Sequence, residues 1–472
     1  MSVVHILRAE MELVTAGAVT APESLTIGSV LRPDLPVARD AWGDPYLPGT
    51  SLAGSLRQQA YRTGREEALF GNVRPGNGTD APPSETVAIA SPVRVLGTRL
   101  ELPQPLDPTQ QLETRLRTAI DRHRAAALPK TLHSRELLPP KTKILLWLRL
   151  DTPSLESPLL DELVGLLATW RPVVGRGRTT GHGQALLTRV LKRSIDLGTA
   201  DGMRHWLMTG GPALVDGHAG VVYDHEKDAV PSLLPELFGQ PLQFRVTDAL
   251  HVGNGHILDR PGHRTGISAV LRDHDNLPIV PGSTWKGVLR ARCEFILRSV
   301  GLRACSSVGE KAGPCGDCVL CEAFGWTEST GSRGQAPPDA EPPPSVGARG
   351  RLVFADSVVR GSTVRIRNHV ALDRVFGGAR DGALYSEETV ENGTLTVSIR
   401  HDRDIPELAR AALLLALDDL AAGHLGIGAG TTRGQGTLTA LSATGHLLGR
   451  ERTRAVETLR RHHAALTEET PA

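Results

Sequence analysis

The sequence predicts two tandem α+β domains in one chain. The main observation is an internal repeat: residues 45–57 are PYLPGTSLAGSLR, and residues 278–290 are PIVPGSTWKGVLR, with no gap between the copies. In each copy an apolar segment ends in Pro-Gly, which predicts a strand, a tight turn and a helix. A Thr or Ser then follows where a helix N-cap is expected, and the N–H groups at such a helix end suit a phosphate.

Two further blocks repeat in the same order. GRGRTTGHG at 175–183 aligns with GAGTTRGQG at 428–436, and all four glycines coincide. Residues 118–149 align without a gap on residues 370–401. The identical positions in that block include Asp121 with Asp373, Arg122 with Arg374, Ser134 with Ser386 and Glu136 with Glu388. Three blocks that occur twice in one order indicate a duplicated domain.

Composition limits the class of protein. The chain has 472 residues, which fits two domains of about 200 residues each. With 53 basic and 52 acidic residues the net charge is +1, so a nucleic acid would have to meet a local groove. Only 4% of the residues are aromatic, which argues against broad base-stacking surfaces. The first apolar stretch is interrupted by charges and no apolar run spans a bilayer, so we expect a cytoplasmic protein whose cysteines are thiols or metal ligands.

The order of elements follows from residue periodicity. The first half suggests an opening strand at 3–14, a helix at 51–63, strands at 86–95 and 143–150, a helix at 155–170 and a last strand at 184–191. The second half repeats this plan from residue 242, with a helix at 406–422. This order favours a ferredoxin-like or RRM-like sheet with helices on one face. We predict a first domain at 1–191, a connector at 192–239, a second domain at 240–445 and a charged tail at 446–472.

The second copy carries a cysteine-rich insertion. The glycines of its Pro-Gly and Phe-Gly are 43 positions apart, against 22 in the first copy, a difference of 21. Four of the five cysteines lie there, with C-x-x-C-x-x-C spacing in the last three: Cys305, Cys315, Cys318 and Cys321. Tetrahedral zinc takes four such ligands, so we predict a closed, structural Zn²⁺ knuckle, with an iron–sulfur cluster or free thiols as alternatives. Cys293, on the apolar side of the preceding helix, is predicted to be a buried thiol.

These motifs together resemble the RAMP superfamily, and more closely the backbone subunits of type III CRISPR effector complexes, here two RAMP units fused in one chain. The resemblance rests on the Pro-Gly turn, the knuckle that ends in Phe-Gly, the D-R-x-x-G-G-A segment and the Gly-rich loop. It implies RNA-recognition-type cores that hold CRISPR RNA by its backbone, with a hairpin that wedges the duplex of guide and target. It also implies partners: other RAMP subunits, a small subunit and a large cyclase-like subunit.

Several residues are candidates for RNA contact. Lys286 and Arg290, one helical turn apart, can reach phosphates, although solvated helix charges are the alternative, and Ala53 replaces the lysine in the first copy. Glycines allow an RNA backbone to approach closely, or they simply allow tight turns. An Asp-Arg pair can equally form a structural salt bridge. The predicted RNA-binding residues are Lys286, Arg290, Arg57, Arg122, Arg374, Gly175, Gly177, Gly428, Gly430 and Arg433.

The resemblance also implies where cleavage would occur. In the family a catalytic Asp precedes an Arg-Asp that lies before the Pro-Gly turn, and Asp34 has that position here, ahead of residues 39–40. Gapless alignment places Ile267 opposite it, and Asp259 is the nearest upstream acid in the second copy. A carboxylate can hold a divalent metal such as Mg²⁺ or accept the proton of an RNA 2′-hydroxyl.

Three functions follow. The leading hypothesis is a double backbone subunit that cuts target RNA at its first domain, as a metal-dependent endoribonuclease. The alternatives are a purely structural guide-RNA-binding subunit and a RAMP endonuclease that processes precursor CRISPR RNA. The last would use a histidine, for which His133 and His182 are candidates.

Overall fold

The computed structural model describes residues 3–20, 33–74, 87–104, 112–121, 126–228, 234–259, 266–306, 313–327 and 347–468. The chain forms two compact units. One comprises Met1–Arg115, Ser134–Arg178 and His182–Leu234, and the other comprises Leu116–His133, Thr179–Gly181 and Pro235–Ala472. Two segments of the first repeat therefore belong to the second unit, whereas the predicted domain boundaries stay a prediction.

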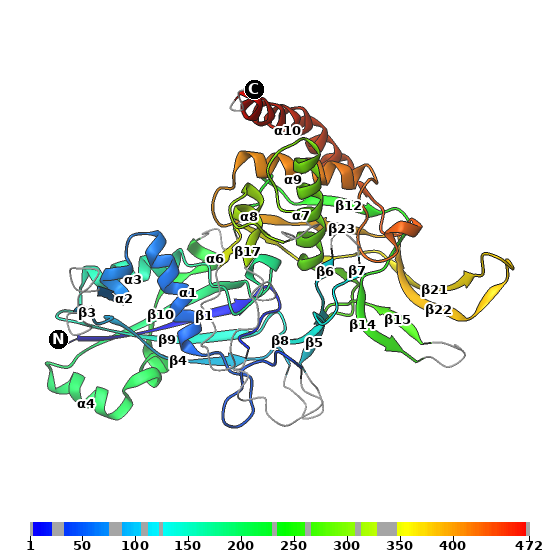
Figure 1. Ribbon diagram of the computed structural model, residues 1–472. Helices are drawn as coiled ribbons and strands as arrows, with labels where there is room; N and C mark the ends of the chain where they lie inside the picture. The colour runs from blue at the N-terminus through cyan, green and yellow to red at the C-terminus, as the bar shows by residue number, and fades with distance from the viewer. Residues whose placement is uncertain are drawn as a thin grey trace, which may run out of the picture. The chain divides into compact units, whose positions relative to one another are not determined.

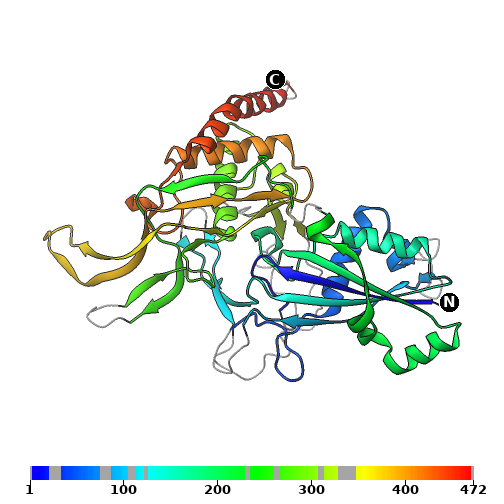
Figure 2. The same cartoon turned by 180° about the vertical axis from the view of Figure 1, so that it is seen from behind.

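The first unit is built on one antiparallel sheet (Figures 1 and 2). Its strand order is β11-β10-β1-β9-β4. The strands are β1 (Val3–Leu13), β4 (Val93–Glu101), β9 (Lys143–Thr152), β10 (Ala185–Asp196) and β11 (Gly220–Asp224). With α1 (Gly49–Arg62) after β1 and α3 (Pro158–Ala168) after β9, the core has the β-α-β-β-α-β order of the ferredoxin-like fold. The predicted α+β class is thereby confirmed.

Alternation along β1 divides the first unit into two apolar layers. Leu7, Met11 and Leu13 pack beneath α1 and α3, while Val4 and Ile6 face the other side. That second side is covered in part by residues of α4 (Ala200–Thr209) and α5 (Leu214–His218), which come from the predicted connector. Helices therefore lie on both faces and not on one. Further short elements are α2 (Glu66–Phe70), α6 (His225–Asp228), β2 (Asn72–Arg74), β3 (Val87–Ile89), and β5 (Glu113–Arg117) paired with β8 (His133–Leu137).

The second unit repeats the central plan. Its sheet has the order β23-β12-β25, formed by β12 (Leu242–Val246), β23 (Thr394–Val397) and β25 (Leu438–Ala440). The helices are α7 (Gly282–Ser299), α8 (Val319–Phe324), α9 (Glu407–Ala421) and α10 (Ser442–Glu468). Trp285, Phe244 and Phe354 lie in its core with the leucines of α9. The tail predicted as a charged helix or frayed end is helical through residue 468, because Leu447, Leu448, Ala455 and Leu459 join this core.

A second sheet extends from this unit. It contains β13 (Ala249–Leu250), β14 (Gly253–Leu258), β15 (Ile267–Val270) and β22 (Ala379–Glu391), with β21 (Thr363–Leu372) paired to β22. The β21–β22 hairpin projects away from the rest of the unit (Figures 1 and 2). The short pairs are β6 (Ile120–Asp121) with β7 (Ala126–Ala127), β16 (Ile279–Val280) with β20 (Ser357–Val358), β17 (Gly325–Thr327) with β18 (Gly347–Arg349), and β19 (Leu352–Phe354) with β24 (Ile399–His401). In the described part of the chain, no helix is both long and apolar enough to cross a membrane.

Candidate metal centre and nucleic-acid interface

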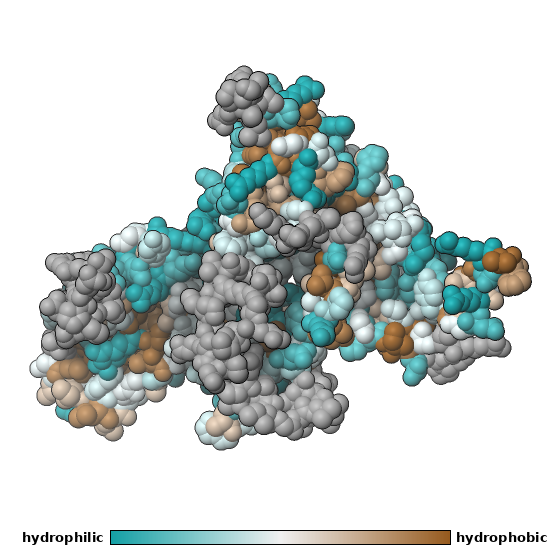
Figure 3. Space-filling view, viewed as in Figure 1, coloured by the Kyte–Doolittle hydropathy of each residue, from teal (hydrophilic) through white to brown (hydrophobic). Residues whose placement is uncertain are grey.

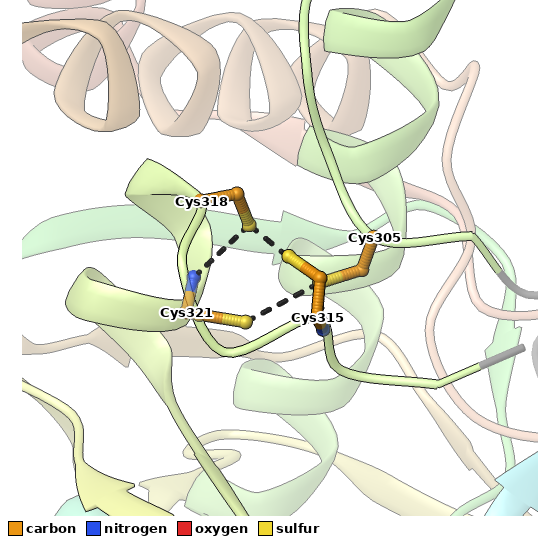
Figure 4. A group of neighbouring side chains, drawn as sticks. All are labelled: Cys305, Cys315, Cys318 and Cys321. Atoms are coloured by element: carbon orange, nitrogen blue, oxygen red, sulfur yellow. Dashed lines mark hydrogen bonds between the residues drawn. The ribbon is translucent and has the colours of Figure 1, made fainter. Parts of the chain in front are cut away.

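Four cysteine side chains converge in the insertion, as predicted (Figure 4). The Sγ atom of Cys305 lies 3.6 Å from those of Cys315 and Cys318 and 3.3 Å from that of Cys321. All four sulfurs lie within 4.8 Å of one another. Zinc–sulfur bonds of about 2.3 Å in a tetrahedron place the sulfurs roughly 3.8 Å apart, so the four residues fit a zinc ion with small adjustments.

The chemistry of the cluster also suits zinc. Cys318 donates a hydrogen bond to the sulfur of Cys305, which lowers the pKa of Cys305 to about 4, while the pKa values of Cys318 and Cys321 are raised. Zinc requires thiolate ligands, so its binding would release the remaining protons. Four protein ligands leave no position for a substrate, so a bound ion would stabilise the loop and not react. Cys293 is fully buried, as predicted, and burial raises the pKa of its thiol.

Arg290 lies beneath the knuckle and is only 7% exposed. Its guanidinium donates to Glu294 Oε1 at 2.9 Å, to the carbonyl oxygen of Gly325 at 2.6 Å, and to the sulfurs of Cys321 and Cys305 at 3.5 and 3.8 Å. These partners all belong to the protein. The structure therefore gives Arg290 a supporting place beside the sulfur cluster, and a contact between Arg290 and an RNA phosphate stays a prediction.

The first copy repeats this arginine contact without the cysteines. Arg57 donates to the carbonyl oxygen of Gly71, at 3.3 Å, which is the counterpart of the bond between Arg290 and Gly325. Its Nε donates to Glu66 at 2.7 Å. The repeated arginine thus fastens its helix to the Phe-Gly turn in both copies, while an RNA contact by the partly exposed Arg57 stays a prediction.

Lys286 is half-buried and differs from an ordinary solvated helix lysine. Its Nζ donates to the hydroxyl of Thr179 at 3.0 Å. Burial lowers the pKa of Lys286 from 10.5 to about 8, and the nearby Arg290 adds to the shift. This change corresponds to about 3 kcal/mol against the charged form, which a bound anion would offset.

The helix ends differ from the prediction. Both helices begin at the glycine itself, with Pro48 or Pro281 in the N-cap position and no side-chain cap, so the expected Thr and Ser caps are wrong. At α7 the N–H of Gly282 donates to the carboxylate of Asp356 at 2.8 Å. A phosphate at this helix end would meet an acid that already holds one N–H, which counts against a phosphate there, and a phosphate at the start of α1 stays a prediction.

Asp34 is exposed and fixed to β8. The N–H and the hydroxyl of Ser134 both donate to Asp34 Oδ2, at 2.6 and 2.8 Å, and the N–H of Asp34 donates to the Ser134 hydroxyl at 2.8 Å. In the second copy Ile267 pairs in register with Ser386, as the alignment requires, but Ile267 is 0% exposed and the Ser386 hydroxyl donates to Asn368. Asp259, the other acid considered, is exposed at the end of β14.

The Arg-Asp motifs after these positions are structural in both copies. Arg39 pairs with the buried Glu136 at 2.7 Å, and Arg272 pairs with the buried Glu388 at 2.9 Å. The same two glutamates accept hydrogen bonds from the N–H groups of Val37 and Val270. The repeat shows that both copies share these glutamates, but the sequence does not show that they are buried. No role could therefore be predicted for them.

The Gly-rich loops use their glycines for backbone conformation. All eight aligned glycines have φ between 69° and 85°, where other residues are strained. A Cβ atom on Gly175 would lie 1.6 Å from a neighbouring carbonyl oxygen, and one on Gly428 would lie 2.4 Å from another. Gly177 and Gly430 face side chains of the protein in the same way. These observations favour the tight-turn alternative, and contact between these glycines and RNA stays a prediction.

The β21–β22 hairpin ends in an exposed apolar and basic tip. Asp373 accepts hydrogen bonds from the N–H groups of Val375 and Phe376, at 2.8 and 3.0 Å, so it shapes the turn and leaves Arg374 exposed beside it. Val375 and Phe376 are 83% and 88% exposed, and Figure 3 shows apolar surface at this end. Arg122, the counterpart of Arg374, lies outside the described residues.

Arg433 lies near an aromatic pair on β21 and β22. Its guanidinium is 5.9 Å from the ring centre of Tyr385, which stacks on His369 at 4.9 Å. Glu387 lies between them, 2.9 Å from His369 and 3.9 Å from Arg433. Half of the Arg433 side chain remains exposed, which leaves it able to face a ligand.

Comparison with known proteins supports the repeat. The model of the RAMP superfamily matches residues 19–185 and again residues 243–439. No curated protein matches the chain. The two matched regions together span more than half of the sequence and coincide with the two copies defined above. The chain therefore belongs to the RAMP superfamily and carries two regions of that family in tandem.

Proposed function

We propose that this chain is a guide-RNA-binding backbone subunit of a type III CRISPR effector complex in antiviral defence, with two RAMP units in one polypeptide. Membership of the RAMP superfamily implies a Cas protein that binds CRISPR RNA. The assignment to type III rests on the order of motifs in both copies. It implies a large cyclase-like subunit, a small subunit and other RAMP subunits as partners.

Local groups would hold the RNA, because the net charge is only +1. Lys286 supplies a cation at a half-buried position, and the exposed Arg374 with its apolar neighbours suits a hairpin that separates paired strands. Such contacts concern the backbone and shape of RNA. Affinity should therefore fall steeply with salt and depend little on guide sequence.

We propose further that the first domain cuts target RNA through Asp34. The observation that supports this is the difference between the copies: an exposed, hydrogen-bonded carboxylate in one and a fully buried isoleucine in the other. A carboxylate there can accept the 2′-hydroxyl proton as the 2′-oxygen attacks phosphorus and the 5′-oxygen leaves. A bound divalent metal such as Mg²⁺ would supply stabilisation of the leaving charge.

The test uses a complex that contains this chain, its guide and a complementary RNA. We expect one metal-dependent cut per chain, lost in Asp34→Ala by about 10²–10⁴-fold in rate with guide and target binding retained. A cut that survives Asp34→Ala and disappears with Asp259→Ala would place the activity in the second domain. A complex that binds target and metal without cutting would leave the purely structural function.

Processing of precursor RNA is the less favoured alternative. His182 is 1% exposed, and its Nδ1 lies 3.1 Å from the carbonyl oxygen of Ala16. A catalytic histidine has to reach a 2′-hydroxyl, which this burial prevents. His133 is half-buried, with its Nδ1 against the carbonyl oxygen of Thr131, and its part in processing stays a prediction.

A further inference from the structure

A cavity of about 400 Å³ lies beside the cysteine knuckle in the second unit. Among the described residues that line it, three are basic (Lys286, Arg290 and Arg349) and none is acidic. Arg290 pairs with Glu294 and Arg349 pairs with Asp402. Within the described part of the chain, Lys286 has only the Thr179 hydroxyl as a polar partner.

The knuckle builds one side of this cavity. Pro314, directly before Cys315, is part of the lining, as is Trp326. Gly316, inside the knuckle, packs on the Trp326 ring so closely that a Cβ atom would lie 3.0 to 3.2 Å from three ring carbons. The position of the tryptophan therefore depends on the backbone between the first two cysteines of the C-x-x-C-x-x-C run.

Arg290 makes a second connection between the sulfurs and the cavity. One end of its guanidinium donates to the sulfurs of Cys305 and Cys321, and the other donates to the carbonyl oxygen of Gly325, which also lines the cavity. Movement of the sulfur cluster must move this arginine or break one of its bonds. The position of the cavity wall therefore depends on the arrangement of the four cysteines.

We propose that this cavity holds a phosphodiester group of RNA against Lys286, and that metal in the knuckle and RNA in the cavity stabilise each other. The inference rests on the proposed RNA-binding function and adds the site and its control. A phosphate would give the half-buried ammonium the anionic partner that it lacks in the described part of the chain. Because coupling between two ligands is reciprocal, each should strengthen the binding of the other.

The first test is a double-mutant cycle in the full-length protein. We would measure the affinity for a synthetic single-stranded RNA of mixed sequence in the wild type, Lys286→Ala, Cys318→Ser and the double variant. We expect about a tenfold loss in each single variant and little further loss in the double. Lys227→Ala, which removes an exposed lysine that pairs with Asp224, controls for the loss of one charge. Losses that multiply to about 100-fold would overturn the inference.

The second test avoids any cysteine variant that might misfold. A chelator and a colour indicator would follow zinc release from the wild-type protein with and without saturating RNA. We expect RNA to slow release about tenfold in the wild type and not in Lys286→Ala. Equal release rates in the wild type with and without bound RNA would overturn the coupling alone. Absence of RNA binding by the wild type would refute the proposed function as well, so the two failures can be told apart.

Discussion

Ser134→Ala should slow target cleavage about tenfold while the fold and RNA binding stay intact. The substitution removes the hydroxyl that donates to Asp34 Oδ2 and accepts the Asp34 N–H, and it leaves the bond from the Ser134 N–H. Hydrogen bonds to charged groups contribute about 1.5–3 kcal/mol. Water can replace part of this one because Asp34 is exposed. A remaining loss of about 1.4 kcal/mol in the orientation of the carboxylate corresponds to tenfold in rate.

The assay is single-turnover cutting at saturating target, measured from pH 5 to pH 8 in steps. In Ser134→Ala the acid limb of the profile should move to higher pH, because a carboxylate that loses a donor is protonated more readily. Ser134→Thr keeps the hydroxyl and should restore most of the rate. Ser386→Ala is the matched control, since that serine occupies the same register in a copy with no carboxylate opposite it. Equal slowing in Ser134→Ala and Ser386→Ala, or an unshifted acid limb, would refute the reasoning.

Three more predictions concern metal, pH and stability. The purified protein should contain about one zinc per chain by elemental analysis, and Cys318→Ser should lose it; less than about half a zinc, or an iron–sulfur absorbance band, would reject the assignment. RNA affinity should be full below pH 8 and fall as pH rises above it, because the pKa of Lys286 is about 8 without RNA and a phosphate raises it; Lys286→Arg should bind equally at pH 7 and pH 9. Glu388→Gln should destabilise the second unit by about 3–5 kcal/mol in urea unfolding, since it leaves Arg272 without its buried partner, and a loss below about 1 kcal/mol would contradict this role.

Much of the fold could be predicted because the duplication repeats local patterns. Apolar spacing located α3 and α9 to within about three residues, and the order of strands and helices was enough for the α+β class. The helix starts were wrong in both copies, since α1 and α7 begin at Gly49 and Gly282 with no side-chain cap. In the structure, residues 116–133 and 179–181 belong to the second compact unit, a grouping that no local pattern in the sequence indicates. Contacts between distant segments leave no local pattern.

The candidate site shows a similar division. Cysteine spacing was sufficient for the knuckle, because four ligands in one short insertion have few other uses. The burial of Arg290 was not predictable, since a helix arginine looks the same whether it faces solvent or a sulfur cluster. Its counterpart Arg57 makes the same bond to a glycine carbonyl. The presence of an arginine at this position in both copies therefore indicated a structural role.

Comparison of the two copies suggests which residues maintain the fold and which carry function. The residues that both copies share hold the framework: the helix arginines fasten the Phe-Gly turn, Glu136 and Glu388 hold the Arg-Asp turns, and the glycines allow positive φ. Asp34, Lys286 and the four cysteines of the knuckle, which are proposed to carry function, occupy positions where the copies differ, whereas Arg374 is shared with Arg122. In the alignment of the two copies Asp34 corresponds to Ile267 and Lys286 corresponds to Ala53, while the cysteines have no counterpart in the first copy. Because Ile267 is fully buried, Ile267→Asp would place a carboxylate in the core instead of recreating the exposed one.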